Sequence, residues 1–150
     1  MEVLDMFAHW EQIRVDLLTT IDDFEKDELD YVPFSNAWSV KETLLHIAHA
    51  EEGWIQYVIR GEYDRWPDDF NKEEYSSKSE IQAKLNEVHK RTNDVLSTLS
   101  LDDLNRVIEF PWNGKGKIGW IIWHVLEHEI HHRGELSLML GLLGREGLDV

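Results

Sequence analysis

The stretch HVLEHEIHHRGE, residues 124–135, decides how the rest of the sequence is interpreted. Apolar residues surround it and would cover much of the circumference of a helix, so we expect a largely buried helix over residues 119–141. At about 100° per residue, one face of that helix carries His124, His128, His131, His132 and Glu135. The sequence therefore predicts a buried helix with a histidine-rich face.

Two histidines four residues apart on a helix can direct ring nitrogens at one ion about 2.0–2.1 Å away. The spacing occurs twice, in His124 with His128 and in His128 with His132, and it does not choose between them. Two ligands alone make a weak site. The histidine-rich face thus predicts a metal site that a residue from elsewhere in the chain completes.

A second helix is expected over residues 39–59, because Ser39 and Glu42 form the pattern of a capping box. His46 falls beside the apolar face of this helix, where it could face a neighbouring helix, whereas His49 lies further round and is expected in water. Glu51 falls within the apolar stripe, where an unpaired carboxylate is costly. The second nitrogen of a metal-bound histidine would be a suitable partner for Glu51, and a plain buried, hydrogen-bonded carboxylate is the alternative.

The remaining pattern predicts an all-α protein. Amphipathic periods indicate two more helices, over residues 3–24 and 79–99. Residues 25–38 and 61–77 lose the period and are predicted to be loops, and residues 100–119 contain an Asn113-Gly114 turn signal that fits a short hairpin or an irregular loop. Four helices of about twenty residues joined by these loops predict a four-helix bundle that forms a single domain over residues 1–150.

The composition narrows the class of protein. The 150 residues include 15 Lys and Arg against 30 Asp and Glu, a formal net charge of -15 that repels phosphate, so no nucleic-acid partner is expected. There is no cysteine, which excludes disulfides, thiolate metal ligands and a thiol nucleophile of the chain's own. The first residues lack the pattern of a signal peptide and no stretch is apolar enough to span a membrane. We therefore expect a cytoplasmic protein without a membrane partner.

Three segments follow one another in the order of a known family: WSVKE at residues 38–42, LHIA at residues 45–48 with Glu51, and HV at residues 124–125 followed by HEIHHRG at residues 128–134. Together they resemble the DinB-like superfamily, the DinB/YfiT-like four-helix metalloproteins related to bacillithiol and mycothiol S-transferases. The resemblance implies a four-helix bundle, commonly a homodimer, that holds a divalent metal through His46, His128 and His132.

Four further residues are expected around these ligands or in the adjoining pocket: Glu51, His124, His131 and Glu135. Many members of the superfamily have glutamine at the position of Glu135, so this chain carries an additional negative charge beside the site. Three imidazoles suit nickel, zinc, iron, cobalt or manganese, and nickel or zinc is the expected ion.

Other conspicuous side chains are expected to be structural or to line the pocket. His49 and His89 are placed by the helical pattern at polar faces, and Arg133 is expected in a salt bridge at the surface or at an interface. Trp54 and Trp123 are candidates for an apolar pocket beside the metal.

Three neutral imidazoles would leave a divalent ion with its full charge and an open position, the condition for Lewis-acid chemistry. The resemblance makes a thiol S-transferase the first hypothesis: the ion binds a low-molecular-weight thiol and presents it to a small electrophile. The absence of cysteine is compatible with a thiol that comes from a cosubstrate.

Two alternatives stay open. Residues 128–132 formally satisfy the HExxH pattern, so a metal-dependent hydrolase of a small substrate would use Glu129 to activate a metal-bound water. A peptidase is not expected, because the residues after His132 do not continue the longer protease motif. In the other alternative the protein is a non-catalytic metal-binding dimer whose ion is closed off by a fourth ligand, His124 or His131.

Overall fold

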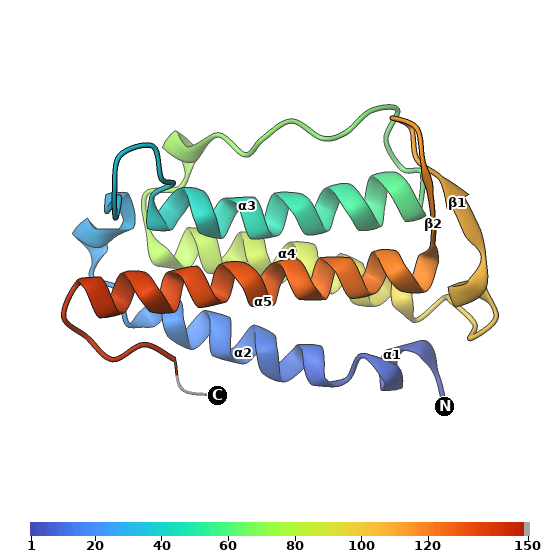
Figure 1. Cartoon of the computed structure of the whole chain (residues 1–150), viewed down its shortest axis with the longest axis horizontal. Helices are drawn as coiled ribbons and strands as arrows, with labels where there is room; N and C mark the ends of the chain where they lie inside the picture. The colour runs from blue at the N-terminus through green and yellow to red at the C-terminus, as the bar shows by residue number, and fades with distance from the viewer. Residues whose placement is uncertain (149–150) are drawn as a thin grey trace.

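Four long helices lie side by side in the computed structural model, which describes residues 1–148 (Figure 1). They are α2 (His9–Asp22), α3 (Val40–Glu52), α4 (Lys78–Leu96) and α5 (Ile118–Leu142), and a short helix α1 (Val3–Met6) precedes them. A π-helical segment η2 (Gly53–Ile59) prolongs α3, and 3-10 turns η1 (Lys26–Asp30), η3 (Lys72–Glu74) and η4 (Asp103–Asn105) lie in the connections. The predicted all-α four-helix bundle is confirmed.

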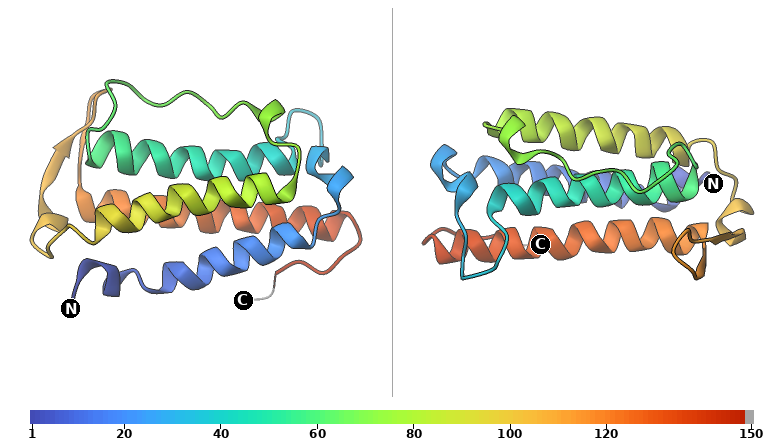
Figure 2. Two further views of the ribbon diagram at one scale, coloured as in Figure 1. Left: turned by 180° about the vertical axis from the view of Figure 1, so that it is seen from behind. Right: turned by 90° about the horizontal axis from the view of Figure 1, so that it is seen from above.

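The helices pack in the cyclic order α2, α4, α3, α5, so neighbours in the chain are not always neighbours in the bundle. α3 and α4 run in the same direction, and residues 60–77 return along the length of α3 to connect them (Figures 1 and 2). β1 (Val107–Glu109) and β2 (Lys115–Lys117) form an antiparallel hairpin at one end of the bundle, before α5. Asn113 and Gly114 between them have φ angles of 76° and 106°, as the predicted turn requires.

The helix starts agree with the sequence pattern, whereas two interruptions do not. The hydroxyl of Ser39 accepts from the amide of Glu42 at 3.2 Å, and the Glu42 carboxylate accepts from the amide of Ser39 at 2.9 Å. The helix predicted over residues 3–24 is instead divided into α1 and α2, and the predicted continuation of α3 becomes π-helical at Gly53. Trp66 from the returning segment packs directly on Gly53, where a Cβ would lie 2.2 Å from its Cζ2 atom. This close approach depends on a residue distant in sequence, so the local period could not indicate it.

A polar layer divides the core into two hydrophobic clusters. One cluster contains Leu17, Leu44, Leu85 and Leu136, and the other contains Ile13, Ile55, Val95 and Ile122, with further apolar residues in each. Between the clusters every long helix contributes a buried side chain that can carry charge: Arg14, Glu51, His89 and Glu129. Within residues 1–148, each helix is too short or too polar to serve as a membrane span.

Candidate metal centre

Three imidazole rings meet between α3 and α5. His46 lies on α3, and His128 and His132 lie one turn apart on α5. Nε2 of His128 is 3.0 Å from Nε2 of His46 and 3.1 Å from Nε2 of His132. His124 stays outside this group, because its ring centroid is 6.4 Å from that of His128 and it stacks on Trp120 at 5.1 Å. The structure therefore brings together the three histidines that the resemblance implied. The alternative ligand His124 lies one helical turn before His128 and outside the group.

The three Nε2 atoms fit an ion better than they fit hydrogen bonds to one another. Oε2 of Glu135 lies 2.7 Å from Nδ1 of His132; the ionised carboxylate only accepts, so Nδ1 carries the proton and Nε2 carries the lone pair. Nε2 of His128 has either one proton or one lone pair and cannot satisfy both neighbouring rings. Two nitrogens that are each about 2.1 Å from one ion lie about 3.0 Å apart at a right angle and about 3.4 Å apart at a tetrahedral angle, so the observed separations of 3.0 and 3.1 Å are close to those of ligands on one ion. The residues present thus fit a divalent metal.

The surroundings keep the imidazoles of His46 and His128 neutral. Burial, with smaller contributions from the rings of His132 and His49, lowers the pKa of His46 to about 4. Burial, with the rings of His132 and His46, lowers the pKa of His128 to about 3. At neutral pH both rings are unprotonated, so protons do not compete for the lone pairs that a metal requires.

The indole of Trp38 covers two of the imidazoles and separates two cavities. Its ring centroid lies 4.4 Å from that of His46 and 5.9 Å from that of His132. The cavity on the His46 side has a volume of about 260 Å³, and the cavity on the His132 side has a volume of about 420 Å³. Trp38 lines both, so the imidazoles lie beside two separate spaces with a common wall.

The cavity next to His46, termed the charged cavity, lies between α3 and the returning segment. Its lining includes Glu42, His49, Asp69 and Lys72. Nζ of Lys72 donates to Oε1 of Glu42 at 2.6 Å, and this bond lowers the pKa of Glu42. Nδ1 of His49 lies 3.1 Å from Oδ1 of Asp69. Such groups suit a ligand that carries ammonium or carboxylate groups.

The cavity next to His132, termed the apolar cavity, has a different lining. Its walls include Phe34, Leu138 and Leu142, and its polar groups include His132 and Glu135. A volume of this size accommodates a small organic ligand. The two cavities therefore favour ligands of opposite character.

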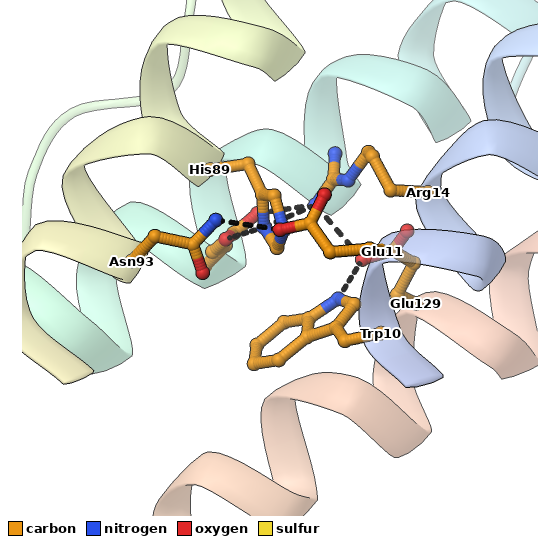
Figure 3. A network of polar contacts seen from close by, with 7 residues as sticks. Trp10, Glu11, Arg14, His89, Asn93 and Glu129 are labelled. Carbon is orange, nitrogen blue, oxygen red and sulfur yellow. Dashed lines mark hydrogen bonds and ion pairs between the residues drawn. The ribbon is translucent and has the colours of Figure 1, made fainter. Parts of the chain in front are cut away.

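Glu51 and Glu129 are buried in the core and bind partners other than the three imidazoles; Figure 3 shows Glu129 beside Trp10 and Arg14. Oε2 of Glu51 accepts from Nη2 of Arg14 at 2.6 Å, and Oε1 lies 2.8 Å from Nδ1 of His89. The prediction that a metal-bound histidine is the partner of Glu51 is wrong, and the alternative of a buried hydrogen-bonded carboxylate holds. Oε2 of Glu129 accepts from Nε1 of Trp10 at 2.7 Å and from Nη2 of Arg14 at 2.8 Å. The structure thus contradicts the role of Glu129 as the base of an HExxH site, because its buried carboxylate is held in the core by Trp10 and Arg14.

Two histidines that were expected in water are buried. The returning segment covers His49, whose Nε2 lies 2.8 Å from the carbonyl oxygen of Pro67, and His89 belongs to the polar layer. His131 is exposed, and its Nε2 lies 3.3 Å from Oε1 of Glu135. The placement of His49 and His89 at polar faces was therefore wrong, because the helical pattern could not indicate which faces a distant segment or helix covers.

The tryptophans next to the imidazoles also differ from expectation. Trp54 packs against the ring of His124 at 5.2 Å and Trp123 is exposed, and neither is among the residues that line the charged or the apolar cavity. The aromatic residue that lines both cavities is Trp38. Its position directly before the helix cap Ser39 could have indicated this, since an apolar residue before a cap packs back on its own helix.

Two arginines occupy buried positions. Arg133 is buried and pairs with Asp16 at 3.2 Å, so the expected salt bridge exists but not at the surface. Arg14 was not singled out from the sequence. The signal was the gap in the apolar stripe between Trp10 and Leu17, which Arg14 fills.

Comparison with known proteins identifies one family and a related bacterial protein. A family model described as the DinB superfamily matches residues 9–136. The uncharacterized protein YizA of Bacillus subtilis (strain 168) is 26% identical over 142 residues, which cover 91% of this chain and 84% of that protein.

Solved structures show the same fold. YfiT from Bacillus subtilis, described as a probable metal-dependent hydrolase with an unusual four-helix bundle topology, superposes with a TM-score of 0.60 at 22% identity over 88% of this chain and 83% of that chain. The mycothiol-dependent maleylpyruvate isomerase superposes with a TM-score of 0.63 at 10% identity over 88% of this chain and 60% of that chain. At these identities the likeness concerns the fold alone.

Proposed function

The chain belongs to the DinB superfamily, and from this premise we propose that it is a divalent-metal-dependent enzyme whose ion is held by His46, His128 and His132. The observation that carries the proposal is that the Nε2 atoms of three imidazoles from α3 and α5 lie close together. A divalent ion with three neutral ligands supplies Lewis acidity and lowers the pKa of a bound water or thiol. Glu135 fixes the tautomer of His132 through Nδ1. Nickel or zinc is the expected metal, and iron, cobalt and manganese also suit three imidazoles.

The reaction that we propose is thiol S-transfer to a small electrophile. One structural neighbour is a mycothiol-dependent enzyme, and this chain has no cysteine, so a reacting thiol has to come from a cosubstrate. Two cavities of opposite polarity on either side of Trp38 support two different reactants. In the charged cavity Asp69 and Lys72 bind the polar groups of a low-molecular-weight thiol. In the apolar cavity Phe34 and Leu138 hold the apolar part of the electrophile.

Metal-dependent hydrolysis of a small substrate is the second candidate, supported by the description of YfiT. The base could not be Glu129, which is held in the core by Arg14 and Trp10. It would have to be Glu42, which lines the charged cavity, or Glu135, which lines the apolar cavity.

We also propose that the protein is a homodimer, as the resemblance implies. Large apolar side chains are exposed along α5, among them Trp120, Trp123 and Ile130, and a second copy would bury them. Analytical ultracentrifugation tests this part independently of the metal: the proposal requires a species of twice the chain mass.

A reaction screen on the nickel- or zinc-loaded protein separates the two chemistries. Thiol S-transfer predicts conjugation of low-molecular-weight thiols with aryl halides or epoxides, and little hydrolysis of esters or amides without a thiol. The variant Lys72→Met should raise the KM for the thiol, whereas Lys90→Met, which removes an exposed lysine paired with Asp94, should not. Hydrolysis that needs no thiol and is unchanged by Lys72→Met would favour the second candidate.

A further inference from the structure

A buried polar layer crosses the middle of the bundle, and all four long helices contribute to it. Arg14 of α2, Glu51 of α3, His89 of α4 and Glu129 of α5 are each exposed by 5% or less. The layer lies between the two hydrophobic clusters, on the core side of α3 and α5. It is therefore separate from the imidazole trio, although it uses the same two helices.

One nitrogen atom of Arg14 joins those two helices. Nη2 donates to Oε2 of Glu51 at 2.6 Å and to Oε2 of Glu129 at 2.8 Å (Figure 3). Glu51 follows His46 by five residues on α3, and Glu129 directly follows His128 on α5. We term Arg14 with the carboxylates of Glu51 and Glu129 the clamp. The clamp is thus attached to α3 within about two helical turns of His46, and to α5 directly beside His128.

The layer is not explained by stability alone. Replacing a buried ion pair with well-packed apolar residues is often neutral or stabilising, whereas such pairs can specify how helices are aligned. Two apolar clusters already supply the burial that holds the bundle together. Alignment of α3 against α5 is needed in particular, because neutral imidazoles without an ion do not attract one another strongly enough to fix it.

The tolerance of a metal centre makes this alignment critical. A slide of α3 by a single residue displaces His46 by about 1.5 Å, whereas metal–ligand distances vary by about 0.2 Å. We propose that Arg14 is a positioning residue for the metal centre, an inference that rests on the proposed function. The guanidinium of Arg14 fixes α3 against α5, so that His46 faces His128 and His132 before an ion binds.

The test separates positioning from stability with two kinds of variant. Arg14→Met alone leaves two buried carboxylates without their cation and is expected to destabilise the fold strongly. The triple variant Arg14→Met/Glu51→Gln/Glu129→Gln removes those charges as well, so its melting temperature should recover while the clamp is still absent. Arg14→Lys keeps the positive charge, but its side chain ends one bond short of the position of Nη2, so the two bonds to Glu51 and Glu129 are weakened; it provides a folded variant if the triple variant does not fold.

Leu17→Ala is the matched control on the same helix, since it creates a cavity in the core without touching the carboxylates. The readouts are the Co(II) dissociation constant, from competition with a chelator, and the ligand-field spectrum of bound Co(II), at a temperature where circular dichroism shows each variant folded. We expect Co(II) to bind about 10–100-fold more weakly to the triple variant, with an altered spectrum, and more weakly to Arg14→Lys by a smaller factor. Leu17→Ala should keep the wild-type constant and spectrum.

Wild-type Co(II) affinity and spectrum in the folded triple variant, or in Arg14→Lys where the triple variant does not fold, would overturn the positioning role and leave the proposed function intact. A loss of affinity in Leu17→Ala as large as in the Arg14 variants would also overturn it, because metal binding would then follow stability. Absence of Co(II) binding in the wild-type protein would overturn both proposals and is distinguishable from the other outcomes.

Discussion

Replacing Glu135 tests how the chain prepares an imidazole for a metal. Oε2 of Glu135 lies 2.7 Å from Nδ1 of His132, so the carboxylate holds the proton on the nitrogen that faces away from the trio. A hydrogen bond to an ionised acceptor contributes about 1.5–3 kcal/mol, and a neutral one contributes about 0.5–1.5 kcal/mol. The Glu135 side chain is 42% exposed, so solvent screening places its bond at the lower end of the range.

Glu135→Gln keeps an acceptor but loses the charge, a difference of about 1 kcal/mol or about fivefold in metal affinity. Glu135→Leu removes the acceptor entirely, which corresponds to about 1.5 kcal/mol or roughly tenfold. Both variants should remain folded, because position 135 is not part of either hydrophobic cluster.

The assay is the Zn(II) dissociation constant at pH 7.5, measured by competition with a chromophoric chelator. Glu127→Gln is the matched control, since Glu127 lies on the same helix, is 67% exposed and is 4.0 Å from His124 rather than from a member of the trio. The Zn(II) dissociation constant of Glu127→Gln should stay within about twofold of the wild-type value, because Glu127 is a surface charge that contacts none of the three ligands. Wild-type affinity in Glu135→Leu, or an equal loss in Glu127→Gln, would refute the reasoning.

Three further outcomes are expected. Chelation of the metal should leave the far-ultraviolet circular dichroism and the cooperative melting in place, because His46, His128 and His132 belong neither to the two hydrophobic clusters nor to the polar layer. Loss of most of the helical signal would instead indicate a structural ion. Gly53→Ala should lift residues 60–77, since an added Cβ would lie 2.2 Å from Cζ2 of Trp66, and limited proteolysis should cut this segment faster than in wild type; an unchanged cleavage rate would contradict the packing. In the metal-free protein the pKa of His46 is lowered to about 4 and that of His128 to about 3, so the unfolded chain binds more protons and the free energy of unfolding should fall as the pH drops below about 6.5. Denaturant titrations that give the same free energy of unfolding at pH 7 and pH 5 would contradict the lowered pKa values of His46 and His128.

Local signals in the sequence were sufficient for the four long helices and the hairpin, but not for the division between α1 and α2. The reciprocal bonds of Ser39 and Glu42 and the positive φ angles of Asn113 and Gly114 arise from neighbouring residues, so the pattern predicts them directly. The change to a π-helix at Gly53 depends on a distant indole and left no local trace.

The candidate site was predictable in part. Helical periodicity and the family resemblance together indicated the trio, and the geometry of the trio agrees with both. The partners of Glu51 and Glu129 were not predictable, because periodicity shows that a side chain faces the core but not which helix lies opposite. That information resides in the cyclic order of the helices, which places Arg14 of α2 against both carboxylates.

Metal content in the variant His46→Ala tests the account most directly. Protein purified without a histidine tag is analysed by inductively coupled plasma mass spectrometry beside wild type and His124→Ala. We predict close to one equivalent of divalent metal in wild type and in His124→Ala, and a small fraction of it in His46→Ala. Full metal content in His46→Ala, or a loss confined to His124→Ala, would contradict a centre built from His46, His128 and His132.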